Sequence, residues 1–180
     1  MERASRLLVA ATLAFGAGCA EPEPAAPRDP FIALARDFEG FVEWPRFTSA
    51  GTAIPEGATP GPTFVYAREI LPVGVARMPV GTMLLKTIEN GPPTDWFVHA
   101  MVKRSGDFNP GGTVGWEFFE LALTDDLEPV ILWRGEGPPS GHGYAAAGVP
   151  DPEAIPLVCN DCHSAAWMTD GVLSPELVER

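Results

Sequence analysis

The chain has 180 residues, of which 46% are hydrophobic and 20% are charged, with 20 prolines and 19 glycines. This length suits one domain with a sizeable core. The frequent Pro and Gly argue against a bundle of long helices, and the plentiful apolar residues argue against a disordered chain. The formal charge of -12 and the lack of a basic run argue against a nucleic-acid partner, which needs a cationic face. Three cysteines are too few for a disulfide scaffold.

The N-terminus predicts export. Arg3 and Arg6 precede an apolar stretch, residues 7–17, that is too short to span a bilayer comfortably. This arrangement is typical of a secretory signal rather than a transmembrane helix. Residues 1–18 are therefore predicted to be removed, and the mature protein is expected in an oxidising compartment on the periplasmic side of the membrane.

The first cysteine predicts a lipid anchor. Cys19 directly follows the small residues Gly16-Ala17-Gly18, a pattern similar to the bacterial lipoprotein cleavage site. Gly16 stands where leucine is usual, so an ordinary secretory cut is the alternative. A tether rich in Pro, Ala and Glu covers residues 19–28, and the folded domain is predicted over residues 29–180. We expect the protein to be attached to the outer membrane only through a lipid on Cys19.

A helix is predicted at the start of the domain. Asp29 suits the cap position and Pro30 suits the first helical position. Gly40 weakens the far end of this helix. Apolar residues recur at helical spacing and predict a face that packs on the core: Phe31, Leu34, Ala35, Phe38, Phe41 and Val42.

Short extended segments divided by turns follow this helix. Runs rich in β-branched and aromatic residues predict strands at 62–66, 82–88, 96–103, 116–123 and 130–133, with turn signals at 90–93 and 109–112. Residues 67–76 are predicted as a short helix or loop, and residues 134–156 as a long loop. Because no long helix separates the strands, antiparallel pairing is expected. The predicted fold is mainly β (α+β), an antiparallel sheet with a few peripheral helices.

The motif that indicates chemistry lies near the C-terminus, where Cys159, Cys162 and His163 form C-x-x-C-H. This motif is typical of c-type haem attachment: two thiols add to the haem vinyl groups and the adjacent histidine ligates the iron. We expect one haem c per chain, attached at Cys159 and Cys162, with His163 as proximal ligand. The second ring nitrogen of His163 should donate to a backbone carbonyl or to water, which would fix the tautomer.

Three other interpretations of the two cysteines remain open. A thioredoxin-like dithiol requires a strand before it and a helix after it in a βαβ unit. A zinc site would have to recruit His99 or His142 as further ligands. A structural disulfide would make the following His163 coincidental. Export to the compartment where c-type haem is attached favours the haem interpretation.

The position of the motif bears on the sixth iron ligand. Only 17 residues follow His163, and Met168, the sole methionine among them, is too near to cross the ring. Packing is the expected role of the upstream methionines Met78, Met83 and Met101. The sixth position is therefore expected to be open or water-filled. Electron transfer alone would need a second strong axial ligand, and we keep it as a third hypothesis behind the two functions described next.

Most of residues 38–173 resemble the cytochrome P-460 family and its relative, the β-type cytochrome c prime. The resemblance is carried by PTFVY at 62–66, GTMLLK at 81–86, FNPGGTVGW at 108–116, and the haem motif followed by Thr169-Asp170. It implies an antiparallel sheet around a C-terminally attached, five-coordinate haem. It further implies either an oxidoreductase acting on a small nitrogen compound such as hydroxylamine, or a non-enzymatic nitric oxide carrier or sensor. A periplasmic redox partner and a homodimer are further expectations.

The resemblance also implies site residues. In the enzyme members a lysine is joined to the porphyrin, and Lys86 stands at that place. The alternative is a lysine at the edge of the sheet whose stem packs on the protein while its ammonium group reaches solvent. Thr63 occupies the place of a distal arginine, which weakens the enzyme hypothesis and favours gas binding. An aromatic distal wall is expected from Phe64, Phe97, Phe118 and Phe119.

Strand alternation leaves the distal base undecided. Glu117 and Phe119 are predicted on one face of their strand, and Phe118 and Glu120 on the other. Either carboxylate is a candidate base, with a solvated carboxylate as the alternative. His99 and His142 are interpreted as ordinary polar residues.

Overall fold

The computed structural model describes residues 30–49, 60–71, 77–105, 107–137, 140–143 and 159–178. The predicted signal, the tether with Cys19, and the cap residue Asp29 lie outside the described residues. Within the described ranges, no helix is long and apolar enough to cross a membrane.

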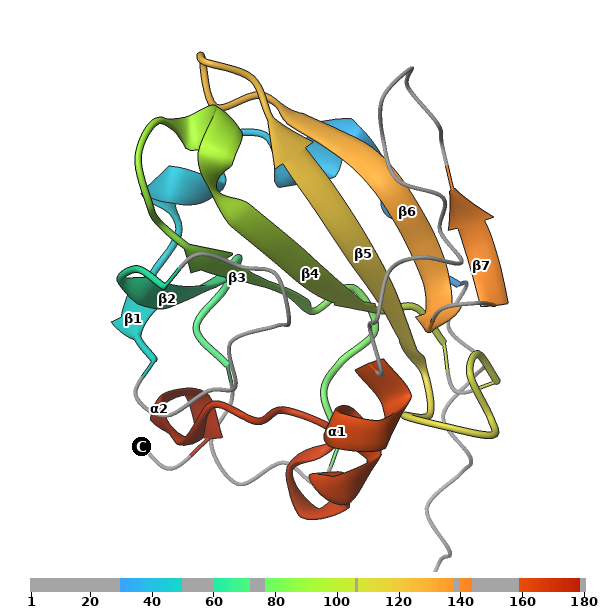
Figure 1. The fold of residues 1–180 in the computed structure, drawn as a ribbon. Helices are drawn as coiled ribbons and strands as arrows, with labels where there is room; N and C mark the ends of the chain where they lie inside the picture. The colour runs from blue at the N-terminus through green and yellow to red at the C-terminus, as the bar shows by residue number, and fades with distance from the viewer. Residues whose placement is uncertain are drawn as a thin grey trace, which may run out of the picture.

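The core of the fold is a single antiparallel sheet in which each strand pairs with the next one along the chain (Figure 1). This arrangement confirms the predicted mainly β architecture, and the predicted strands coincide closely with β2 to β5. The seven strands are β1 (Arg46–Thr48), β2 (Thr63–Ala67), β3 (Met83–Ile88), β4 (Phe97–Lys103), β5 (Trp116–Leu123), β6 (Pro129–Gly137) and β7 (Ser140–Gly143).

The predicted first helix is wrong as a single α-helix. Two short 3-10 helices stand there instead, η1 (Ala35–Phe38) and η2 (Phe41–Glu43). Gly40, which lies between them, has a left-handed backbone with φ 67°. This conformation terminates η1 before η2 begins. The packing role of the segment is confirmed, because Phe38 and Phe41 are fully buried.

The predicted long loop after residue 133 is corrected in part. Strand β6 continues to Gly137 and pairs with β5 through Phe119 opposite Arg134, after which β7 pairs back. Glycine at 135 and 137 marks this stretch as a loop by composition, yet its extended backbone can still form ladder hydrogen bonds. Residues 144–156 lie outside the described part. No helix forms at 68–71, and residues 72–76 are likewise outside.

Each face of the sheet carries its own hydrophobic cluster. On what we call the first face, Phe38 and Phe41 pack against alternate residues of the central strands, among them Tyr66, Leu85, Val98, Ala100 and Phe119. On the second face lie the side chains of Val65, Leu84, Met101, Trp116, Phe118 and Trp133. The predicted packing of Met78, Met83 and Met101 is confirmed, because all three are buried.

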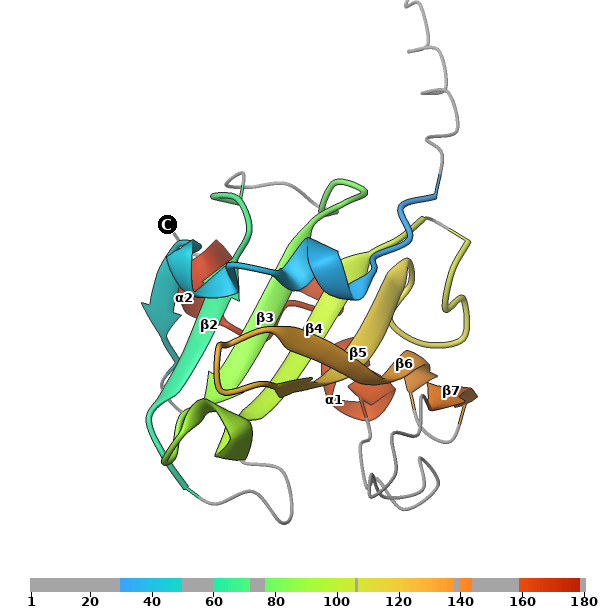
Figure 2. The ribbon, with the colours of Figure 1, turned by 90° about the horizontal axis from the view of Figure 1, so that it is seen from above.

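The C-terminal segment covers the second face. It contains α1 (Cys159–Ala165), η5 (Trp167–Thr169) and α2 (Pro175–Val178). Figure 2 shows these red elements on one side of the sheet and the blue 3-10 turns on the other. Val172 and Leu177 anchor the segment in the second cluster, whereas α1 contributes no buried residue. The sheet therefore separates a structural compartment from one that holds the C-x-x-C-H motif.

Candidate functional site

Helix α1 brings the three motif residues to the second face. Cys159 packs against the second hydrophobic cluster, whereas Cys162 is exposed, and both thiols are free. The His163 ring lies 5.0 Å from the ring of Phe118 on β5, measured between centroids. One short helix thus carries both thiols and the imidazole, and places Cys159 and His163 against the second face of the sheet.

One nitrogen of His163 is engaged by the backbone. Its Nδ1 lies 2.6 Å from the carbonyl oxygen of Gly171, and because a carbonyl only accepts, Nδ1 carries the proton. The predicted carbonyl partner is therefore confirmed. Burial lowers the pKa of His163, although the Gly171 carbonyl opposes that shift. A neutral imidazole with Nε2 as its lone-pair nitrogen is the form that ligates metals.

The carbonyl that receives this bond is held in a tight left-handed turn. Asp170 has φ 53° and Gly171 has φ 82°. The Gly171 N–H donates to the carbonyl of Ala166 at 2.8 Å, and the Thr169 hydroxyl donates to the carbonyls of Ala166 and Val172. A Cβ at position 171 would overlap the side chain of Thr113. Glycine is required here both for its conformation and for the close approach.

A row of polar side chains crosses the second face beside α1. Lys86 on β3 stands opposite His99 on β4, His99 opposite Glu120 on β5, and Glu120 opposite Trp133 on β6. Three buried atoms of this row have no hydrogen-bond partner among the described residues: His99 Nε2, Glu120 Oε2 and Trp133 Nε1. We call these four residues the polar row. Buried polar atoms without protein partners are completed by water, by an ion or by a bound ligand or cofactor.

The polar row faces α1 and favours neutral groups. Burial, together with the charges of Lys86 and His163, lowers the pKa of His99 to about 3. Burial also lowers the pKa of Lys86, against an opposing effect of Cys162. Burial raises the pKa of Glu120. Each shift disfavours the charged form, as expected where water is excluded, and such perturbed groups cluster at functional sites.

The aromatic residues predicted to line one distal wall lie on two different faces of the sheet. Phe97 and Phe118 lie on the second face, where Phe97 meets the ring of His99 at 4.3 Å between centroids. Phe64 and Phe119 pack with the first cluster instead. Their placement in the same pocket was wrong, because strand alternation carries them to the other side of the sheet. Thr63 stands at the start of β2, opposite Ile88, and its hydroxyl points to the Gly61 carbonyl at 3.4 Å.

The structure separates the two candidate glutamates. Glu117 lies on the first face and accepts two hydrogen bonds from Arg134, each 2.8 Å long, so its carboxylate is committed to an ion pair. Glu120 lies in the polar row. The candidate for a proton-accepting group is therefore Glu120.

The other interpretations of the cysteines find little support. Burial raises the pKa of Cys159 to about 12, the reverse of the activated thiol in a thioredoxin-like site. All strand pairings in the described part are antiparallel, so no βαβ unit is formed there. Among the described residues, no group of three or more His, Cys, Asp or Glu side chains is arranged to hold a metal ion. The side chain of His142 lies outside the described part.

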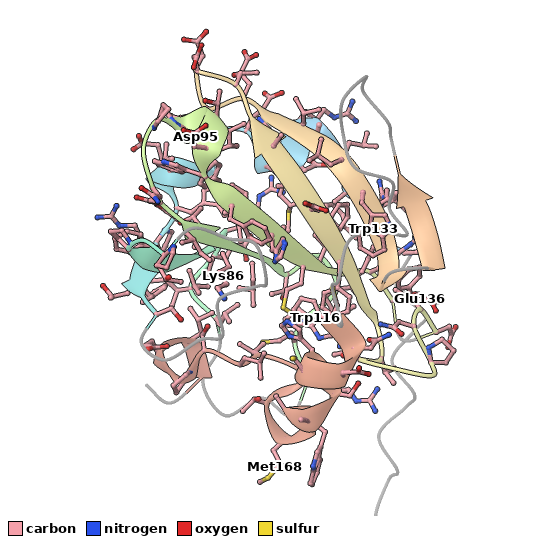
Figure 3. The ribbon with its side chains drawn as sticks, viewed as in Figure 1. Lys86, Asp95, Trp116, Trp133, Glu136 and Met168 are labelled. Carbon is pink, nitrogen blue, oxygen red and sulfur yellow. The ribbon has the colours of Figure 1, made fainter. Side chains whose placement is uncertain are left out.

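Sequence reasoning missed His99. Its strand and its face were predictable, but its neighbours are set by the register of β3, β4 and β5. Register depends on pairing between distant segments and is not written in one strand. Met168, by contrast, is 75% exposed and points away from the sheet in Figure 3, consistent with its exclusion as an axial ligand.

The class defined by fold and site is an antiparallel β protein with a C-terminal C-x-x-C-H helix laid against a buried polar row. Comparison with known proteins found no matching family model, no matching curated protein and no matching solved structure. The resemblance to the cytochrome P-460 family therefore rests on the motifs quoted above.

Proposed function

We propose that this protein is a c-type haem oxidoreductase that acts on a small nitrogen compound such as hydroxylamine. The observation that carries the proposal is the pairing of α1 with the polar row. His163 has Nδ1 engaged by Gly171, two thiols lie on the same helix, and the facing wall holds buried polar atoms without partners in the described part. This donor set fits a haem, since it offers one imidazole nitrogen and two thiols at the required spacing.

The residues that would hold the group are Cys159 and Cys162, through thioether bonds, and His163 through Nε2. When bound, the haem would supply an iron that accepts a nitrogen lone pair and takes up electrons. Lys86 lies half-buried in the row, and burial lowers the pKa of its amine. An amine that is more easily neutral is a better nucleophile, which supports the expected bond between Lys86 and the porphyrin edge. That bond would replace a ring C–H bond, so its formation would also require an external two-electron oxidant and the loss of two protons.

The chain's own contribution to turnover would be proton handling and orientation. Oxidation of an N–H compound releases protons, and Glu120 Oε2 is a buried acceptor without a partner among the described residues. Burial raises the pKa of Glu120, which makes its carboxylate a stronger proton acceptor. Nε2 of His99 adds a second hydrogen-bonding atom that would orient the substrate.

One observation favours a second function, electron transfer. A buried imidazole with an unpartnered Nε2, as at His99, is the side chain that a second axial ligand would need. The nitric oxide carrier is less favoured, since it expects an apolar pocket and the facing wall carries Lys86, His99 and Glu120.

The test is the spectrum and mass of protein matured in a periplasm that can attach c-type haem. The expected result is one haem on Cys159 and Cys162, a high-spin spectrum and oxidation of hydroxylamine. Bare or disulfide-bonded cysteines would overturn the proposal. A low-spin spectrum that becomes high-spin in His99→Ala would establish the electron carrier instead.

A further inference from the structure

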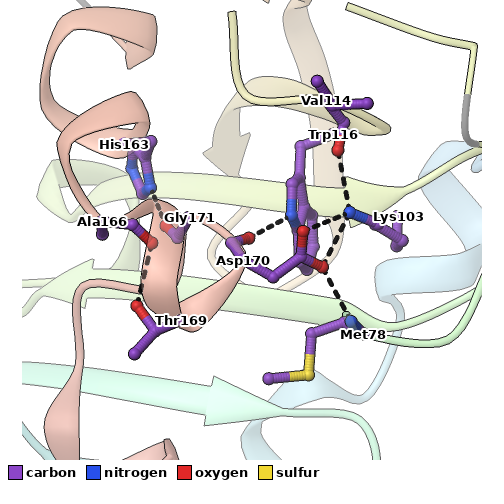
Figure 4. A network of polar contacts seen from close by, with 9 residues as sticks. All are labelled: Met78, Lys103, Val114, Trp116, His163, Ala166, Thr169, Asp170 and Gly171. Atoms are coloured by element: carbon purple, nitrogen blue, oxygen red, sulfur yellow. Dashed lines mark hydrogen bonds and ion pairs between the residues drawn. The ribbon is translucent and has the colours of Figure 1, made fainter. Parts of the chain in front are cut away.

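A buried ion pair lies next to the turn whose Gly171 carbonyl contacts His163 (Figure 4). Lys103, near the end of β4, is only 5% exposed. Its Nζ lies 2.7 Å from Oδ2 of Asp170 and donates to Oδ1 of Asp170 and to the Val114 carbonyl, both at 2.8 Å. Neither residue belongs to the polar row or to the C-x-x-C-H motif.

Further bonds fix Asp170 from other elements. The backbone N–H of Met78 donates to Oδ2 at 2.7 Å, and the indole N–H of Trp116 donates to the Asp170 carbonyl. Strand β4, strand β5 and the segment before β3 thus converge on one residue of the C-terminal segment. Asp170 immediately precedes Gly171, whose carbonyl accepts the Nδ1–H of His163.

Stability alone does not account for this arrangement. Burying a lysine and a carboxylate costs desolvation that their attraction only partly offsets, and apolar residues of similar volume commonly serve as well or better. The pair instead holds a non-glycine residue in a left-handed turn, at φ 53°, which an unconstrained chain avoids. A strained turn held by converging polar groups is typical of a site where geometry matters.

We infer that Lys103 and Asp170 are positioning residues that fix the Gly171 carbonyl on the Nδ1–H of His163. The inference rests on the proposed function, because it assigns His163 Nε2 to iron. A carbonyl held firmly on Nδ1–H fixes the ring and raises the basicity of Nε2. A more basic imidazole stabilises the oxidised metal and lowers its reduction potential.

The test compares Asp170→Asn and Lys103→Met in the haem-loaded protein. Asparagine tolerates the left-handed turn, but its amide group places a second donor against Lys103 or the Met78 N–H. Methionine keeps the buried apolar stem and removes the charge. Both variants should raise the midpoint potential and lower the iron–histidine stretching frequency, with haem still attached.

The matched control weakens a second buried ion pair of the described part, that of Glu117 with Arg134. Glu117→Gln weakens the bidentate bond to Arg134 on the first face, away from His163. This variant should lose thermal stability while its potential and stretching frequency stay as in the wild type. If Asp170→Asn or Lys103→Met also loses only stability, the pair is structural and the inference is overturned.

Failure of the proposed function would look different. The wild-type chain would then carry no haem, and the same variants would be compared by the ¹⁵N chemical shifts of the His163 ring. A locked Nδ1–H tautomer in the wild type that becomes mixed in Asp170→Asn would still support the positioning role. An unchanged tautomer would overturn it.

Discussion

Two glutamates three residues apart on β5 are expected to behave in opposite ways. Glu120 lies in the polar row, and Glu117 is bound to Arg134 on the other face. Glu120→Gln should lower hydroxylamine oxidation by about 100-fold or more, the range for loss of a general base. Its stability should change little, because burial already disfavours the charged form. Steady-state turnover measures the rate of oxidation, and urea unfolding of the same sample measures the stability.

Glu117→Gln serves as the control for this prediction. It leaves Arg134 buried without its full counter-charge and should cost about 2–4 kcal/mol of unfolding free energy. Its turnover should match the wild type wherever the protein is folded. Equal turnover in Glu120→Gln and wild type would remove Glu120 from the mechanism.

Lys86 carries a separate prediction about the haem spectrum. Lys86→Ala should keep the haem attached, since the proposed thioether bonds at Cys159 and Cys162 would form independently of the lysine. Any red-shifted ferrous Soret band should return to the position of an ordinary c-type haem. Absorption spectra and the masses of haem peptides measure the two effects. An unchanged spectrum together with a haem peptide lacking Lys86 would rule out the linkage.

At the scale of single residues, the sequence predicted which face a side chain takes but not which residue it meets. Alternation correctly separated Glu117 from Glu120. The meeting of Lys86, His99 and Glu120 depends on the pairing of three strands. The ion pair of Lys103 with Asp170 spans 67 residues of sequence, and no local pattern announces it.

At the scale of elements, the central strands β2 to β5 were predictable, whereas the first helix, β1 and β7 were not. Runs of β-branched and aromatic residues between turn signals specify β2 to β5 locally. Apolar spacing of three to four residues, however, suits successive 3-10 turns as well as an α-helix. The left-handed Gly40 then decides in favour of two separate turns. The conformation of Gly40 depends on tertiary packing, because Phe38 and Phe41 on either side of it must both reach the first cluster. The local sequence does not contain that information.

Gly40 gives a clean test of this account. Its φ of 67° strains any other residue, yet a Cβ there would meet nothing within 4 Å. Gly40→Ala should therefore cost about 1 kcal/mol through the backbone alone, measured by urea unfolding. Gly111→Ala is the matched control, since its Cβ also meets nothing within 4 Å and its φ is not left-handed. A cost at Gly111 equal to that at Gly40 would contradict the backbone explanation.

At the scale of the whole molecule, the sheet divides the protein into parts of unequal stability. The first cluster is assembled from the 3-10 turns and the central strands, without the C-terminal segment. Helix α1 has only seven residues and buries none of them. A helix this short is not stable alone in water. Its contacts with the rest of the described part include a reciprocal amide pair, in which Asn109 and Asn160 donate to each other at 2.8 and 3.0 Å.

We therefore predict that haem attachment stabilises α1 far more than it stabilises the sheet. In Cys159→Ala/Cys162→Ala, amides of α1 should exchange with solvent at least about tenfold faster than in the haem-loaded protein, which is a loss of about 1.4 kcal/mol in local opening free energy. Amides of β3 to β5 should keep their protection, because the first cluster does not include α1. Amides near Val172 and Leu177 serve as the internal reference for the C-terminal segment, since both residues are buried in the second cluster.

Hydrogen exchange read by NMR or mass spectrometry resolves these regions. Parallel loss of protection in β3 to β5 would mean that the haem holds the entire fold together, and the division of the molecule by its sheet would then be wrong.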